Sequence, residues 1–144
     1  LVNERSGVPS MCWGIIERCY EESLKLANEL EENGVPLAQT QSVQFNIYKM
    51  YMKLKNVENI VFRTAYMQKK GIVDISFVNA AKAYSSESAV EVANMALKMF
   101  GEYGTQRAFA FEKMFRDAKL LELGAGTTVI NLMTAARNEL GLVK

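Results

Sequence analysis

Residues 116–128 read Arg-Asp-Ala-Lys-Leu-Leu-Glu-Leu-Gly-Ala-Gly-Thr-Thr, and the rest of the chain is organised around this stretch. It joins two helical patterns through a Gly-Ala-Gly-Thr turn, because glycine tolerates the left-handed backbone that ends a helix and threonine favours a helix start. The apolar spacing predicts a short helix over about 107–118 before the turn and a helix over about 126–140 after it.

Three longer helical patterns precede this stretch, with apolar residues three or four positions apart. They cover 7–32, 38–70 and 75–100. Gly34 and Gly71 predict helix stops, and Asp74 predicts an N-cap. No segment alternates with period two for long enough to predict a strand. We therefore predict an all-α fold, an up-down four-helix bundle with an additional short helix.

The apolar stripe of the second helix runs from Val43 to Ala65 in steps of three and four residues. It is longer than a lone bundle needs, which predicts self-association. Small residues crowd the third pattern between positions 80 and 89, which predicts close helix packing.

Composition sets the class of protein. The 144 residues are 49% hydrophobic and 23% charged, with a net charge of +1, so neither a nucleic acid nor a membrane is the expected partner. The absence of histidine excludes histidine-based catalysis, and no metal site is expected. Cys12 and Cys19 are seven residues apart on one predicted helix, too far for a disulfide. We expect reduced thiols and a cytoplasmic protein, or a mitochondrial matrix protein in a eukaryote.

Four segments together resemble the C-terminal helical domain of the acyl-CoA dehydrogenases, over essentially the whole chain. They are 115–119 with 124–127, 100–104, 81–82 and 3–5. The Gly-Ala-Gly-Thr wording is most similar to the isovaleryl-CoA dehydrogenase branch. The resemblance implies that residues 1–144 are one domain of a longer protein, and that the isolated piece is inactive. The sequence begins with leucine, which also suggests a piece of a longer chain.

The resemblance also implies a reaction, the flavin-dependent α,β-dehydrogenation of an acyl-CoA thioester. In most of the family the catalytic base is a glutamate at the position that reads Ala125 here, and alanine cannot act as a base. In the isovaleryl branch the base comes from the start of the first helix, which corresponds to Glu4. Glu4 is therefore the predicted catalytic residue. The implied substrate contacts are Asn3, Arg5, Ala125 and Gly126.

FAD is the implied cofactor. Its implied contacts are Gln41, Lys98, Phe100, Gly101, Thr127 and Thr128. The chain departs from the family pattern at Leu30, Lys98 and Glu102, which weakens the expectation for the FAD diphosphate. The implied partners are an acyl-CoA, an electron acceptor such as an electron-transfer flavoprotein, and further copies of the chain in a dimer or tetramer. In this family the active site is shared with other domains and with a neighbouring subunit.

Some of these residues also have a purely structural interpretation. Glu4 could be a solvated carboxylate or an acid that favours a helix N-terminus, and Thr127 could be only an N-cap. For Arg116 and Asp117 we expect structural ion pairing. For the whole chain, the alternatives are a relative that does not dehydrogenate, or a helical oligomerisation or interaction module without a cofactor.

Overall fold

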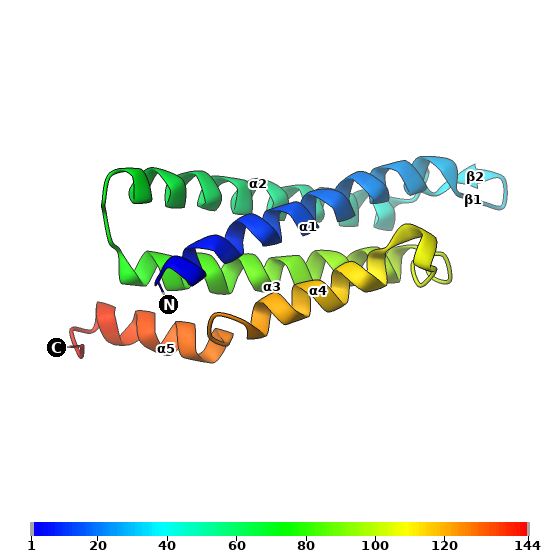
Figure 1. Cartoon of the computed structure of the whole chain (residues 1–144). Coiled ribbons are helices and arrows are strands. Elements are labelled where there is room, and N and C mark those ends of the chain that lie inside the picture. The colour runs from blue at the N-terminus through cyan, green and yellow to red at the C-terminus, as the bar shows by residue number, and fades with distance from the viewer. Residues whose placement is uncertain (1, 144) are drawn as a thin grey trace.

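The computed structural model describes residues 2–143 and contains five α-helices (Figure 1). They are α1 (Val2–Glu29), α2 (Gln41–Lys69), α3 (Ile75–Met99), α4 (Phe111–Leu123) and α5 (Thr128–Glu139). The first three run up, down and up, and α4 and α5 follow one another along α3 in the fourth position. The predicted all-α, up-down bundle is confirmed.

The start and the end of α1 differ from the prediction. The helix begins at Val2 rather than near residue 7, so Pro9 lies inside it and is buried. It ends at Glu29 and is followed by two short antiparallel strands, β1 (Glu31–Glu32) and β2 (Val35–Pro36). Asn33 and Gly34 have φ angles of 53° and 78° and connect these strands. The predicted helix stop at Gly34 is wrong, because Asn-Gly favours a two-residue hairpin turn that needs positive φ twice.

Two predicted helix boundaries are confirmed at the α2–α3 connection. Gly71 has φ 66°, and the amide of Ile72 donates to Met67 O at 2.9 Å, which closes α2 with a Schellman motif. Asp74 caps α3, since its side chain accepts from the Phe77 amide at 2.9 Å. Two 3₁₀ turns, η1 (Leu37–Gln39) and η2 (Arg107–Phe109), precede α2 and α4.

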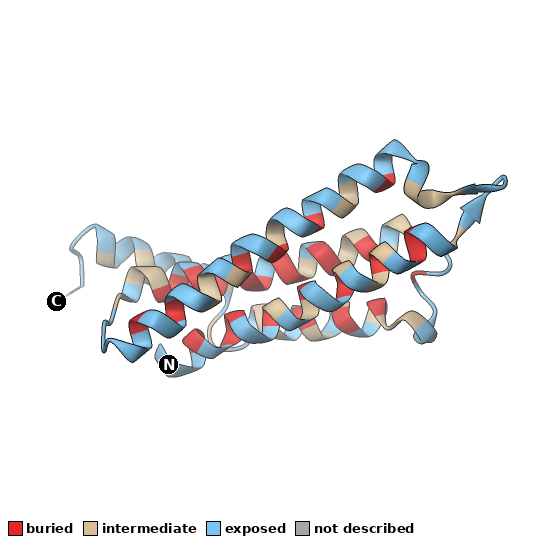
Figure 2. Ribbon diagram, turned by 90° about the horizontal axis from the view of Figure 1, so that it is seen from above, coloured by how far each residue is buried: buried red, intermediate tan, exposed pale blue. Residues whose placement is uncertain are grey.

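The core runs along the axis of the bundle, where the buried faces of the helices meet (Figure 2). Helix α3 contributes mostly alanine and serine, so neighbouring helices approach it closely. The predicted stripe of α2 packs inward, with Val43, Met50, Leu54 and Val57 buried. That stripe is therefore used within the bundle, and the argument for self-association that rested on it does not hold.

Both thiols lie in this core and form no disulfide, as predicted. Burial raises the pKa of Cys12 and of Cys19 to about 12, so neither is a nucleophile near neutral pH. Within residues 2–143, no helix is long and apolar enough to cross a membrane. The same residues contain no cluster of three or more metal-binding side chains.

Gly104, in the connection between α3 and α4, has no room for a side chain. A Cβ there would lie 2.6 Å from Leu97 O, a backbone atom that cannot move away cheaply. We expect Gly104→Ala to lower the free energy of unfolding by about 1–3 kcal/mol, as overpacking does. The matched control is Gly14→Ala on α1, where no atom lies within 4 Å of the new Cβ.

Gly14→Ala should raise the free energy of unfolding by about 0.5–1 kcal/mol, because alanine is a better helix former than glycine. Urea unfolding followed by circular dichroism measures both variants. Equal free energies for the two variants would contradict the close contact at Gly104.

Candidate functional site

The turn between α4 and α5 is held in a left-handed conformation at two successive residues. Ala125 has φ 54° and Gly126 has φ 95°. A positive φ is uncommon for alanine and costs of order 1 kcal/mol, so it persists only where surrounding contacts impose it. Those contacts come from three other segments of the chain.

Helix α1 supports the turn through Arg5. Its side chain is only 9% exposed, and its Nε donates to Ala125 O at 3.1 Å. Its Nη1 donates to Asn79 Oδ1 on α3 at 2.8 Å, and Asn79 in turn donates to Ile75 O. Arg5 therefore contacts the turn from inside the bundle. Its predicted contact with substrate remains a prediction.

Helix α3 supports the turn through Lys82, which is fully buried. Its ammonium donates to Glu122 O at 2.7 Å and to Gly126 O at 2.6 Å. Glu122 lies in the last turn of α4, where backbone carbonyls have no partner within the helix. Burial lowers the pKa of Lys82, and the electrostatic effects of Cys12 and Glu122 partly oppose it.

Helix α5 completes the support with a buried amide, Asn131. Its Nδ2 donates to Gly126 O at 2.8 Å and to Thr127 O at 3.0 Å. Gly126 has space for these side chains only because it lacks a Cβ, which would lie 3.1 Å from Arg5 Nη2. The turn is thus bound from within by donors on α1, α3 and α5.

The outer side of the same turn forms a pocket with the first turns of α1. The pocket has a volume of about 510 Å³. It is lined by Asn3, Glu4, Gly7, Val8, Met11, Leu120, Leu121, Gly124 and Ala125. Glu4 is exposed and lies in the first turn of α1. Among the described residues that line this pocket, it is the only ionisable one. The arrangement offers one carboxylate beside an apolar surface.

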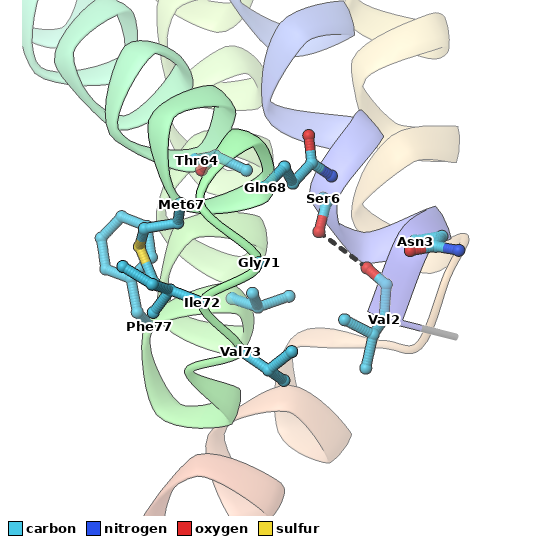
Figure 3. A pocket seen from close by; sticks show the side chains of 11 residues that line it. Val2, Asn3, Ser6, Thr64, Met67, Gln68, Gly71, Ile72, Val73 and Phe77 are labelled. Atoms are coloured by element: carbon cyan, nitrogen blue, oxygen red, sulfur yellow. Dashed lines mark hydrogen bonds between the residues drawn. The ribbon is translucent and has the colours of Figure 1, made fainter.

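A second pocket, of about 310 Å³, lies where the start of α1 meets the end of α2 and the start of α3 (Figure 3). Asn3 lines both pockets. None of the described residues that line this pocket is charged, and its Ser6 hydroxyl donates to Val2 O at 2.8 Å. It could hold an apolar group but offers no acid or base.

The predicted FAD contacts lie in two separate places. Thr127 and Thr128 begin α5 beside the turn, whereas Gln41 begins α2 and Lys98 ends α3 at the far end of the bundle. Lys98 is 16 residues beyond Lys82 on α3, or about 24 Å along the helix axis. One chain therefore does not bring these residues together.

The residues at the start of α5 suit a polar ligand. The Thr128 hydroxyl is buried and has no hydrogen-bond partner among the described residues, and Thr127 is an exposed N-cap whose side chain makes no capping bond. At the far end, Gly101 is exposed with φ 53°. Phe100 is only 4% exposed, and its ring stacks on that of Phe111 with the ring centroids 5.8 Å apart, so Phe100 acts as a core residue.

Arg116 and Asp117 are structural, as expected. Arg116 Nε pairs with Glu112 at 2.9 Å, and Asp117 pairs with Lys113, both one turn apart on the surface of α4. The sequence analysis assigned no role to Lys82, Asn79 or Asn131. The signal for Lys82 was a lone charge on an otherwise small and apolar helix face.

The family model "Acyl-CoA dehydrogenase, C-terminal domain" matches residues 1–140. A 3-(aryl)acrylate reductase of Clostridium sporogenes is 29% identical over 134 residues, which are 93% of this chain and 36% of the relative. An acryloyl-CoA reductase (NADH) of Anaerotignum propionicum is 33% identical over 133 residues, 92% of this chain and 34% of the relative.

Among solved structures, butyryl-CoA dehydrogenase from Megasphaera elsdenii superposes with a TM-score of 0.90 at 27% identity. The match covers 94% of this chain and 36% of that one. The chain thus spans little more than a third of the length of these relatives.

Proposed function

This chain belongs to the acyl-CoA dehydrogenase family, as its C-terminal domain, and on that premise we propose that the full-length protein is a flavin-dependent enzyme that dehydrogenates an acyl-CoA thioester between Cα and Cβ. Glu4 is the proposed base. The observation that carries the proposal is one pocket in which Glu4 and the Gly124–Ala125 backbone lie together, beside apolar side chains.

The chemistry needs a base beside an apolar surface. The α-proton of a thioester is acidic enough to be removed when the carbonyl accepts hydrogen bonds. A carboxylate in Glu4 would take that proton, and an acyl chain would lie against Val8, Met11 and Leu121. Ala125 leaves room for the acyl group where the usual glutamate would stand. When bound, FAD supplies the hydride acceptor for Cβ.

Residues of this chain would hold FAD at two places. The exposed Thr127 hydroxyl and the backbone amide of Thr128 would donate to it at the start of α5. Gln41, Lys98 and the Gly101 backbone would contact FAD at the far end, and a neighbouring subunit would have to bring the two ends together. Lys98 supports this proposal as an exposed cation for a phosphate, while Glu102 beside it is unfavourable.

Self-association is part of the proposal. Large apolar side chains lie exposed on the outer face of α2, which the bundle leaves uncovered. They are Phe45, Tyr48, Met52, Phe62 and Tyr66. A patch of this kind is typical of a protein interface. We therefore propose a dimer or tetramer.

We also propose an electron-transfer flavoprotein as the electron acceptor. The two free thiols support a reducing compartment, such as the cytoplasm.

Acyl specificity stays open to test. The Gly-Ala-Gly-Thr turn supports a short branched acyl group such as isovaleryl. The similarity to two reductases supports a second candidate, in which the same residues work in reverse on an α,β-unsaturated thioester. Glu4 would then return the proton to Cα, since the two directions share one transition state.

The test is anaerobic mixing of the full-length, FAD-loaded protein with a panel of saturated acyl-CoAs. We expect bleaching of the flavin absorbance band with at least one of them, and isovaleryl-CoA is the first to try. A parallel panel of enoyl-CoAs, mixed with the dithionite-reduced protein, tests the reductive direction.

The proposal would be overturned if no acyl-CoA bleached the flavin band and no enoyl-CoA reoxidised the reduced flavin. That result would favour a relative that does not dehydrogenate. A colourless protein that does not retain FAD would favour an interaction module.

A further inference from the structure

The carbonyl groups of the α4–α5 turn point into the bundle, onto positive charge. Ala125 O accepts from Arg5, and both Glu122 O and Gly126 O accept from Lys82. Asn131 adds a neutral donor to Gly126 O at 2.8 Å. These bonds join residues that are far apart in sequence, so the tertiary structure sets the direction of each carbonyl.

The direction of a carbonyl fixes the direction of the next amide. A peptide unit is planar and trans, so the C=O of one residue and the N–H of the next point opposite ways. The inward carbonyls of Ala125 and Gly126 therefore turn the amides of Gly126 and Thr127 outward. No acceptor within residues 2–143 is recorded for either amide. The turn presents two donors in front of α5, whose first amides are also without helical partners.

Lys82 is an unusual way to hold a turn. A buried ammonium loses its hydration, which costs several kcal/mol unless strong hydrogen bonds replace it. No carboxylate forms an ion pair with Lys82 among the described residues, and its hydrogen bonds go to the two carbonyls. The charge of Glu122 also favours the ammonium. An apolar residue would fill the same volume without that cost. Both hydrogen bonds of the ammonium go to carbonyls at the end of α4 and in the turn, and so hold the orientation of the turn.

We propose that Lys82 is a positioning residue for the proposed reaction: it binds Glu122 O and Gly126 O and so directs the Thr127 amide, beside the Gly126 amide that Arg5 directs through Ala125 O, toward an acceptor oxygen of a bound ligand. The inference rests on the proposed function for the identity of that ligand. The acceptor is an oxygen either of the acyl thioester or of FAD. The two sources are separated by experiment.

The variants are Lys82→Met, which keeps the length of the side chain but removes every donor, and Lys82→Gln, which keeps amide donors without the charge. Ser85→Ala is the matched control. Ser85 lies one turn further along α3, is fully buried, and its hydroxyl has no partner among the described residues. All three are made in the full-length protein.

The first readout does not depend on activity. Hydrogen exchange of a peptide that spans the turn should become about 10-fold faster in Lys82→Met, because local opening is no longer opposed by the ammonium. Lys82→Gln should give an intermediate rate, and Ser85→Ala should give the wild-type rate. Peptides from α2 should not change in any variant.

The second readout is flavin reduction. In Lys82→Met the reduction rate should fall about 100-fold, as expected for misplaced groups, with partial recovery in Lys82→Gln. If the acceptor is on the thioester, the affinity for FAD stays at the wild-type value. If the acceptor is on FAD, that affinity falls as well.

Wild-type exchange at the turn in folded Lys82→Met would overturn the proposal, and so would wild-type flavin reduction in that variant. Failure of both Lys82 variants to fold would assign Lys82 a purely structural role and also overturn it. If none of the tested acyl-CoAs reduces the flavin of the wild-type protein, the proposed function is refuted instead. Hydrogen exchange then still tests whether Lys82 holds the orientation of the turn.

Discussion

Replacing Glu4 by glutamine in the full-length protein is expected to slow flavin reduction by substrate about 1,000-fold, within the range for loss of a general base. Glutamine has nearly the same shape but cannot accept the α-proton. FAD should stay bound, because Glu4 lies in the acyl pocket and not among the proposed FAD contacts. Stopped-flow absorbance under anaerobic conditions measures the rate, and the flavin spectrum before mixing measures occupancy.

Glu17→Gln is the matched control for this variant. Glu17 is also an exposed glutamate on α1 but does not line the pocket, so reduction should proceed at the wild-type rate. Wild-type reduction in Glu4→Gln itself would end the assignment of the base.

A double variant tests the geometry more directly. Glu4 on α1 and Ala125 in the α4–α5 turn line the same pocket. Glu4→Gln combined with Ala125→Glu should therefore recover part of the lost rate, because a carboxylate at 125 reaches the same space. A double variant no faster than Glu4→Gln alone would show that position 125 does not face the reacting carbon.

Gly126→Ala is expected to lower the free energy of unfolding by about 3 kcal/mol, from backbone strain and from disturbed hydrogen bonds to a charged group. Gly126 has φ 95°, which an L side chain rarely adopts, and the new Cβ would meet Arg5 Nη2 at 3.1 Å. Arg5 would have to shift by a few tenths of an ångström, which strains its hydrogen bonds to Ala125 O and Asn79 Oδ1. Chemical denaturation of the full-length protein measures the loss.

The control for Gly126→Ala is Gly141→Ala after α5. Gly141 has φ 68° with no atom within 4 Å of a new Cβ, so its substitution tests backbone strain without a clash. It should cost about 1 kcal/mol. Equal losses at the two positions would mean that the contact with Arg5 contributes nothing.

Some of this molecule could be predicted because the relevant interactions are local. The stop at Gly71 and the cap at Asp74 depend on residues within five positions, and both were confirmed. The hairpin at Asn33 and Gly34 was also local, and it was missed only because glycine after a helix was read as a cap. The start of α1 at Val2 was missed because Pro9, which lies inside the helix, does not say how many turns precede it.

The candidate site was predictable only in part. Family resemblance singled out Glu4 and the turn at Ala125, and the fold places both in one pocket. It also grouped Phe100 with the FAD contacts, whereas the fold places that side chain in the core. Lys82 stood out only as a lone charge on its helix face, because its partners Glu122 O and Gly126 O lie 40 and 44 residues away in sequence. Asn131 carried no comparable signal.

The sequence by itself determined the helices, most of their boundaries and the character of the bundle, because hydrophobic period and capping act over one or two turns. The tertiary structure alone decided how residues 116–128 are held. Arg5 is 120 residues from Ala125, and Lys82 is 44 residues from Gly126. A buried cation binds a carbonyl only where folding has excluded water and brought the two together, and no spacing along the chain records that meeting.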